Sequence, residues 1–256
     1  MGRLALDGVP TLALARRWGV PQAGVFRRLP SSLDAVHDLG AQGAPHGTAV
    51  VAEEQTAGRG RGGRTWHSPV GGVWLGMLFR PPGGGAGAQL GAVAIRAGLV
   101  LADVVDEILG RASTQLKWPN DVLLAERKVA GILCEGRWQG DALQWLAVGV
   151  GVNVCNPIPA ELAARAIALE ELAPGVQRID LLDKLVPALL PLAAGGGRAL
   201  LSEAECEAFV ARDWLSGRLL RQPVFGRACG VSNDGALLVD SGSGTTRVRE
   251  GHVELA

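Results

Sequence analysis

Glycine and arginine alternate in one short segment of the chain, from Gly58 to Arg64. Its four glycines leave backbone N–H groups uncovered and permit positive φ angles, and three arginines project between them. Exposed amides and forked guanidinium cations together suit a phosphate-bearing ligand. We therefore expect a loop that closes over a polyphosphate or an adenylate.

Other interpretations of this loop are weaker. Gly58, Gly60 and Gly63 match G-x-G-x-x-G, but that motif binds a dinucleotide only when it opens a helix, and here Gly71 and Gly72 lead into a strand. An Arg-Gly-Gly segment that binds RNA is usually longer and disordered, whereas strands are predicted on both sides of this one. Taken alone, the loop could also be a solvated surface loop.

Lysine is rare in this chain and occurs only at Lys117, Lys128 and Lys184, while every other cationic side chain is arginine. An ammonium group is a compact point charge, and a guanidinium group is a broad planar fork. Two of the lysines lie close together, in Lys117-Trp-Pro-Asn-Asp and Arg127-Lys128. We interpret them as part of a site shaped for the smaller cation, with chance placement as the alternative.

Composition excludes several function classes. The 25 basic and 25 acidic residues balance, which argues against a general nucleic-acid binder. The four cysteines and four histidines have no metal-ligand spacing, so we expect reduced thiols and no metal site built by the protein, and we do not expect His67 to touch a ligand.

The N-terminus is not typical of a signal peptide, and the apolar stretch 90–109 is interrupted by charges. We therefore predict a cytoplasmic protein that does not cross a membrane.

Apolar periodicity predicts the elements that position these residues. Helical spacing is found at 11–18, 89–109, 159–171, 181–193 and 203–214. Strands are predicted at 48–54, 73–79, 115–118, 121–124, 128–138 and 143–153, with a flexible connector at 82–87. Short β segments follow at 219–225, 227–231, 236–240 and 245–248, which is typical of a small barrel. We place a domain boundary near 215–219, which divides the chain into domains 1–214 and 215–256.

Three motifs in these elements resemble the signature of biotin–protein ligases, in the order and spacing of that family. They are Gln-Thr-Ala-Gly-Arg-Gly-Arg at 55–61, Lys-Trp-Pro-Asn-Asp at 117–121 followed by Arg-Lys-Val-Ala-Gly-Ile-Leu at 127–133, and Gly-Val-Gly-Val-Asn at 149–153. The resemblance implies an α+β fold, in which a class II aminoacyl-tRNA synthetase-like catalytic domain of mixed sheet and helices precedes an SH3-like β-barrel. The segment before Phe26 is too short for the DNA-binding domain that some members carry, so we expect the form without it and no DNA partner.

The resemblance also implies an activity. Such a ligase joins biotin to AMP with ATP and Mg²⁺, and then passes biotin to a lysine of a biotin carboxyl carrier protein. A homodimer is a further expectation from the family. The alternatives are a lipoate–protein ligase with the same two-step chemistry, and a biotin-binding regulator without catalysis.

Residue roles follow from the resemblance position by position. Biotin contacts are expected from Ser31, Ser32, Gln55, Gly58, Arg59, Gly60, Arg61, Trp66, Lys128 and Gly131. ATP contacts are expected from Arg59, Arg61, Trp66, Lys117, Asn120, Lys128 and Asn153. The catalytic set is Lys128 between biotin's carboxylate and the α-phosphate, Arg59 and Arg61 on the phosphates, and Asp121 as the candidate to orient or accept the proton of the acceptor amine.

Two positions depart from the family pattern, and one assignment has an alternative. Leu33 stands where the family has asparagine, and Gly62 stands where it often has arginine. These departures bear on the detail of substrate binding. Asp121 could equally be a turn residue at the start of a strand.

Overall fold

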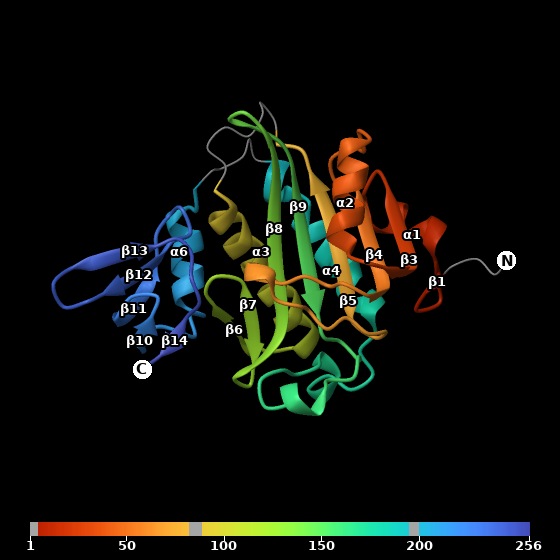
Figure 1. Cartoon of the computed structure of the whole chain (residues 1–256). Helices are drawn as coiled ribbons and strands as arrows, with labels where there is room; N and C mark the ends of the chain where they lie inside the picture. The colour runs from red at the N-terminus through yellow and green to blue at the C-terminus, as the bar shows by residue number, and fades with distance from the viewer. Residues whose placement is uncertain (1–4, 82–88, 195–199) are drawn as a thin grey trace.

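The computed structural model describes residues 5–81, 89–194 and 200–256, so the predicted connector at 82–87 lies outside the described residues. Its centre is a seven-stranded mixed sheet of order β3-β4-β5-β9-β8-β7-β6 (Figure 1). Only β3 and β4 run parallel, and every other neighbouring pair is antiparallel. In chain order the strands are β3 (Ala23–Leu29), β4 (Ala49–Gln55), β5 (Val73–Phe79), β6 (Thr114–Lys117), β7 (Asp121–Leu124), β8 (Arg127–Gln139) and β9 (Ala142–Val152).

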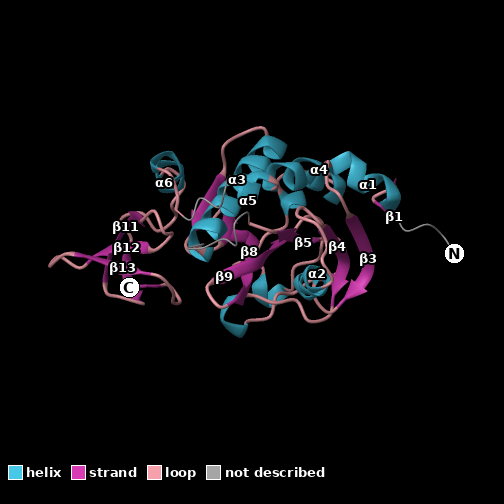
Figure 2. Ribbon diagram, turned by 90° about the horizontal axis from the view of Figure 1, so that it is seen from above, coloured by secondary structure: helices cyan, strands magenta, loops and turns pink. Residues whose placement is uncertain are grey.

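Helices cover both faces of this sheet, as Figure 2 shows. On one face lie α1 (Thr11–Trp18), α3 (Leu90–Leu109), α4 (Arg178–Leu189) and the short α5 (Pro191–Ala194), and on the other lies α2 (Ser32–Ala41). Strand β5 is buried along its whole length, with Gly76 and Leu78 packed against α2 and Trp74 against the Trp66 ring. The predicted mixed sheet flanked by helices is therefore confirmed. Within the described ranges, no helix is long and apolar enough to cross a membrane.

Strand β3 and helix α2 were not predicted from the sequence. The Ser31 hydroxyl caps the helix by accepting a hydrogen bond from the Leu33 N–H at 3.3 Å. Leu33 and Val36 then bury one helical face against the sheet. The signal was present, as a serine followed by a short amphipathic run, but ten residues give little periodicity to detect.

The predicted helix at 159–171 is wrong. Two short 3₁₀ turns stand there instead, at Ala160–Leu162 and Leu169–Glu171. The chain between them pairs with β8, because the Lys128 N–H donates to the Arg165 carbonyl and the Ile167 N–H donates to the Lys128 carbonyl, at 2.8 and 3.1 Å. Pairing with β8 therefore overrides the helical propensity of an alanine-rich segment.

Two other predicted helices have different bounds. Helix α6 (Glu203–Val210) stops before 214 because the following backbone bonds to β6, where the Leu116 N–H donates to Arg212 and Leu116 accepts from Trp214, at 2.8 and 2.9 Å. The helix predicted at 181–193 begins earlier, at Arg178, and is divided into α4 and α5.

The C-terminal part is a five-stranded antiparallel sheet of order β13-β12-β11-β10-β14, where a small barrel was predicted. Its strands are β10 (Leu219–Gln222), β11 (Gly226–Val231), β12 (Leu237–Asp240), β13 (Thr245–Val248) and β14 (Glu254–Leu255). The last of these was not predicted, and neither were the two-residue strands β1 (Ala5–Leu6) and β2 (Val9–Pro10). The division into 1–214 and 215–256 stays a prediction.

A tryptophan in the predicted Lys-Trp-Pro-Asn-Asp motif joins the C-terminal sheet to the larger part of the chain. The buried Trp118 indole donates to the Gly235 carbonyl at 2.9 Å. Glycine is required at 235 because φ is +83° and a Cβ would lie 2.5 Å from the carbonyl carbon of Gly91, at the start of α3. The backbone at Gly235, in the C-terminal part, therefore lies directly against the backbone at the start of α3.

Asp213 lies buried at the junction between the two parts and is only 8% exposed. One carboxylate oxygen accepts from the Leu215 N–H at 2.9 Å, and the other has no hydrogen-bond partner among the described residues. Burial raises the pKa of Asp213 from its ordinary 3.8 to about 6, against the smaller lowering effect of the Leu215 bond.

The variant Asp213→Asn tests this burial. The folded-state pKa lies above the unfolded one, so the stability that Asp213 contributes is lost as pH rises from about 4 to about 6 and stays lost above that range. Asparagine has no such dependence. In urea unfolding at about pH 8 we expect the variant to be more stable than wild type by up to about 3 kcal/mol, and at about pH 4 we expect no gain. If the free energies of unfolding of variant and wild type differed by the same amount at both pH values, the buried carboxylate would not be ionising in this pH range.

Candidate active site

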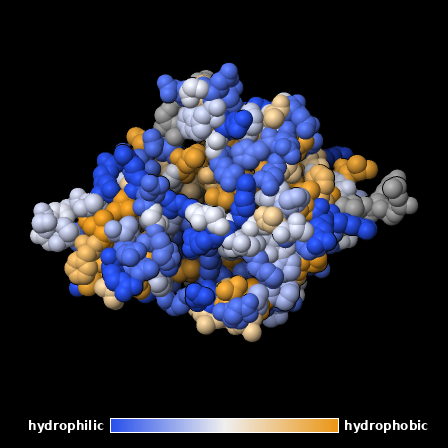
Figure 3. All heavy atoms as spheres, viewed as in Figure 1, coloured by the Kyte–Doolittle hydropathy of each residue, from blue (hydrophilic) through white to orange (hydrophobic). Residues whose placement is uncertain are grey.

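A cavity of about 580 Å³ opens between the Gly/Arg loop (residues 58–64) and strands β8 and β9. This volume suits a small-molecule substrate. The loop crosses in front of the sheet (Figure 1), and on the same face hydrophilic residues gather over the middle while hydrophobic ones form small separate patches (Figure 3). The predicted residues that line the cavity are Ser31, Ser32, Gln55, Arg59, Gly60, Arg61, Trp66, Lys117, Asn120, Asp121, Lys128, Gly131 and Asn153.

Gly58 is the predicted residue that the structure does not bring to the cavity wall. A Cβ at this position would lie 2.5 Å from the Trp66 carbonyl oxygen and 2.5 Å from the Ser68 hydroxyl. The Gly58 carbonyl accepts from the Trp66 N–H at 2.8 Å. Gly58 thus allows the two arms of the loop to pack together.

Lys128 reaches the cavity because of an irregularity in β8. Asp121 pairs with Gly131 and Val122 with Ala130, but Leu123 then pairs with Lys128, so one residue of β8 is extra. Side chains alternate along a regular strand, which would place Lys128 and Gly131 on opposite faces. The bulge turns Lys128 to the face of Gly131, a way in which bulges commonly aim side chains at a site.

Glycines on β8 and β9 make room for the indole of Trp66. Gly131 and Gly151 are directly paired across the two strands. A Cβ on Gly151 would lie 2.7 Å from the Trp66 ring nitrogen, and a Cβ on Gly131 would lie 3.2 Å from both the Trp66 ring and the Lys128 ammonium. The Trp66 N–H has no hydrogen-bond partner among the described residues, so it is available to an acceptor on a ligand.

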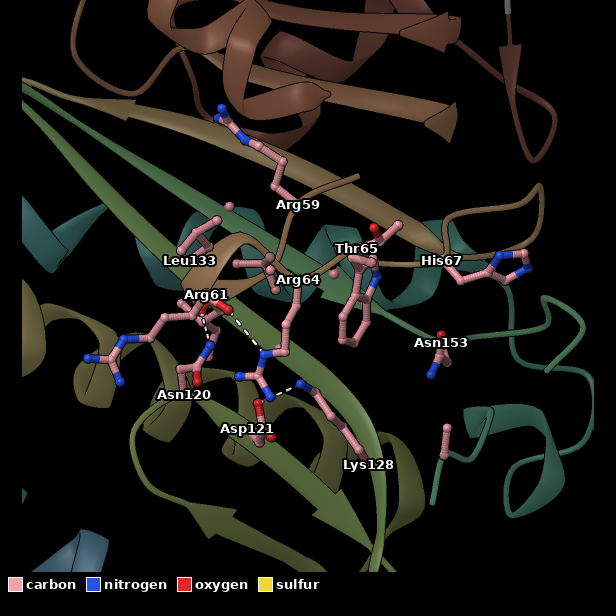
Figure 4. A pocket seen from close by; sticks show the side chains of 18 of the residues that line it. Arg59, Arg61, Arg64, Thr65, His67, Asn120, Asp121, Lys128, Leu133 and Asn153 are labelled. Atoms are coloured by element: carbon pink, nitrogen blue, oxygen red, sulfur yellow. Dashed lines mark hydrogen bonds and ion pairs between the residues drawn. The ribbon is translucent and has the colours of Figure 1, made fainter. Parts of the chain in front are cut away.

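The Lys128 ammonium is the centre of a cationic group. It lies 2.6 Å from Asp121 Oδ1, an ion-pair distance, and 4.8 Å from the centre of the Trp66 ring. Figure 4 shows the Arg64 side chain extending toward this same pair. Burial lowers the pKa of Lys117, and the charges of Lys128 and Arg64 lower it further, against the opposing effect of Asp121. Positive charge therefore exceeds negative charge at this point of the cavity.

The three loop arginines point in different directions, which the sequence did not predict. Arg59 turns away from Lys128 in Figure 4 and lies 2.9 Å from Asp34 and 3.0 Å from Glu135. Arg61 lies over the Trp118 ring, with its guanidinium carbon 5.8 Å from the ring centre. Arg64, which was not among the predicted site residues, is the one directed at Lys128 and Asp121.

One end of the cavity is built by the start of α2. The Ser32 N–H donates to the Gln55 side-chain oxygen at 2.7 Å, and the Gln55 amide donates to Ser68 at 2.9 Å. Leu33, the first departure from the family pattern, fills the space above Gly149, where a Cβ would lie 2.8 Å from its Cγ. This end therefore combines fixed polar groups with an apolar wall.

Two predicted asparagines form hydrogen bonds beside the cavity. Asn153 is buried, and its side-chain oxygen accepts from the amide of Asn156 at 3.2 Å. The Asn120 amide donates to the Ile132 carbonyl at 2.6 Å. Asn156 lines the cavity as well and was not predicted.

Several lining residues come from segments that carried no motif. Trp214 lies just before the C-terminal sheet and His252 lies between β13 and β14, and His67, which was not expected near a ligand, also lines the cavity. The Lys117 ammonium lies 4.8 Å from the centre of the Trp214 ring. The positions of Trp214 and His252 depend on how distant segments pack, so the sequence carried no local signal for them.

Gly62, the second departure, sits in the short 3₁₀ turn Arg61–Gly63 with φ of +69°. This left-handed conformation favours glycine over arginine. Among the described residues, no group of three or more His, Cys, Asp or Glu side chains could hold a metal ion.

Known proteins resemble this chain over most of its length. The bifunctional ligase/repressor BirA of Bacillus subtilis is 31% identical over 238 residues, which cover 89% of this chain and 72% of its own. The biotin–[acetyl-CoA-carboxylase] ligase of Mycobacterium tuberculosis is 33% identical over 221 residues, which cover 81% and 78%.

Structure and family comparisons agree with these relatives. The biotin protein ligase from Aquifex aeolicus, solved in complex with biotin and ATP, is similar with a TM-score of 0.75 and 27% identity over 92% of this chain and 99% of that one. The model of the biotin/lipoate A/B protein ligase family matches residues 25–153. Fold, cavity and sequence together establish that the chain belongs to the biotin/lipoate A/B protein ligase family.

Proposed function

We propose that this chain is a biotin–protein ligase, which forms biotinyl-5′-AMP from biotin and ATP and then transfers biotin to a lysine of a biotin carboxyl carrier protein. The observation that carries the proposal is the position of Lys128. It lies beside Asp121 and Trp66, under the Gly/Arg loop, in a cavity of the size that biotin and a nucleotide require. A relative of similar fold was solved with both biotin and ATP.

In the first step, a carboxylate oxygen of biotin attacks the α-phosphorus of ATP, and the bond to pyrophosphate breaks. Both reactants are anions, so their approach requires compact positive charge. Lys128 and Lys117 supply it, with Arg64 directed at the same place. Arg61 can reach the phosphates if it leaves the Trp118 ring, where a cation–π contact at 5.8 Å holds it weakly.

The product is a mixed anhydride that water would hydrolyse. The Gly/Arg loop covers the cavity, and the Trp66 indole packs against Gly131 and Gly151 on β8 and β9, so that together they exclude solvent. In the second step, the carrier's lysine amine attacks the carbonyl carbon, a C–N bond forms, and AMP leaves. Asp121 is the carboxylate placed to accept the amine's proton once Lys128 has turned to the phosphate.

Magnesium belongs to this proposal as an ion that arrives with ATP. Mg²⁺ in such sites is held mainly by phosphate oxygens with one or two carboxylates, and Asp121 offers one. Its charge would assist the departure of pyrophosphate. A homodimer, a cytoplasmic location and the absence of a DNA partner stay predictions from the sequence.

The direct test is the intact mass of an apo biotin-carrier domain after incubation with this protein, ATP, Mg²⁺ and biotin. We expect the mass to rise by one biotinyl group only when ATP is present. A gain with lipoate in place of biotin would assign the chain to lipoate transfer. Binding of biotin without any gain would indicate a regulator.

Lys128→Ala is expected to slow biotinyl-adenylate formation by roughly 100- to 1,000-fold, the usual effect of removing one charge-stabilising group. Lys184→Ala is the matched control, because Lys184 pairs with Glu107 at 2.6 Å on the exposed surface. Quenched-flow measurement of the adenylate compares them. Normal formation in a folded Lys128→Ala protein would remove this lysine from the mechanism.

Gly151→Ala is expected to weaken biotin and ATP binding about tenfold or more, because its methyl group would collide with the Trp66 ring at 2.7 Å and displace the indole. Gly98→Ala is the control, since a Cβ there meets its nearest neighbour at an ordinary 3.6 Å. Calorimetric titration with biotin and with ATP measures the affinities of both variants. Equal affinity in the two variants would show that the position of the Trp66 indole does not affect ligand binding.

A further inference from the structure

Arg59 is held by two carboxylates on separate elements. Its guanidinium lies 2.9 Å from Asp34, in the first turn of α2, and 3.0 Å from Glu135, on β8. The side chains of all three residues are between 31% and 46% exposed, and a single exposed ion pair contributes little stability. Because Arg59 pairs with both carboxylates at once, it connects the loop to α2 and to β8, the two elements beside the cavity.

Glu135 is positioned by a hydrogen bond from His37, independently of Arg59. The Trp145 indole N–H donates to His37 Nδ1 at 3.1 Å, so this nitrogen carries no hydrogen. His37 Nε2 therefore carries the hydrogen and donates to Glu135 at 3.0 Å. The bond from His37 and the charge of Arg59 hold the pKa of Glu135 below its usual range despite its partial burial.

The backbone on either side of Arg59 shows which part of the loop is anchored. Arg59 forms an isolated antiparallel bridge with Thr65, and the Gly60 N–H donates to the Arg64 carbonyl at 2.7 Å. Arg59 thus stands at the base of the loop, and Arg61 and Arg64 stand beyond it. A fixed base determines where the other two arginines can reach.

We propose that Arg59 anchors the Gly/Arg loop over the cavity, with Asp34 and Glu135 as its positioning residues, and that it is not a direct ligand of the phosphates. The anchor keeps the loop in place over the reactive adenylate. This role rests on the proposed function, because the adenylate is the ligand that must be retained.

A double-mutant cycle separates anchoring from direct contact. The variants are Arg59→Ala, the pair Asp34→Asn with Glu135→Gln, and all three together, and the measurement is the release rate of preformed biotinyl-adenylate. We expect Arg59→Ala and the carboxylate pair each to speed release about five- to tenfold, and the triple variant to be no faster than either. Arg59→Lys should partly restore retention, since it keeps the charge.

The opposite pattern would overturn the proposal. If Arg59 touched the phosphates, neutralising Asp34 and Glu135 would free it for the ligand and leave retention unchanged or better, while Arg59→Ala alone would speed release. Glu107→Gln is the control for loss of an exposed ion pair, because Glu107 pairs with Lys184 at 2.6 Å away from the cavity.

A second readout does not depend on catalysis. Trypsin cleaves after arginine, so cleavage at Arg61 and Arg64 in the ligand-free protein reports how firmly the loop is held. We expect the carboxylate variants to be cleaved there about five- to tenfold faster than wild type, with Glu107→Gln unchanged. Faster cleavage in a protein that makes no adenylate would reject the proposed function and keep the anchor, whereas unchanged cleavage would reject the anchor.

Discussion

In the proposed reaction, two anions must approach each other in a cavity from which water is excluded, and this requirement accounts for the main features of the site. A compact cation must stand where a carboxylate and a phosphate meet, with no other side chain in the way. The bulge in β8 turns Lys128 to the cavity, and the glycine pair at 131 and 151 leaves space for the Lys128 side chain and the Trp66 indole. The Trp66 indole packs directly against both glycines.

The same constraint explains why the cavity draws on the whole chain. The Trp118 indole, within one motif, bonds to Gly235 of the C-terminal sheet, and the neighbouring Lys117 faces the Trp214 ring. Trp214 in turn donates to Glu126 at 2.6 Å, at the turn that precedes Lys128. The C-terminal sheet and Trp214, which precedes it, therefore contact the segments around Lys117 and Lys128, so their packing affects the geometry of the site.

Much of this arrangement could be predicted from sequence because the signals were local. The long apolar periodicity of α3 and the continuous apolar run of β5 gave their bounds almost to the residue. The motifs at 55–61, 117–121 and 127–133 indicated residues that do meet in one cavity.

The features that could not be predicted from the sequence depend on pairings between distant segments. The 159–171 region forms no long helix because its backbone bonds to Lys128, and nothing within the segment reveals that partner. The direction of Arg59 is set by Asp34 and Glu135, and its separation in sequence from Glu135 is 76 residues. The aim of Lys128 depends on an extra residue in a strand, which alternation alone would have missed.

Exchange of labelled pyrophosphate into ATP isolates the first step of the proposed reaction and needs no carrier protein. We expect exchange that requires biotin and Mg²⁺ and that stops when biotin is omitted or replaced by lipoate. Exchange supported by lipoate alone, or no exchange under conditions where biotin and ATP both bind, would contradict it.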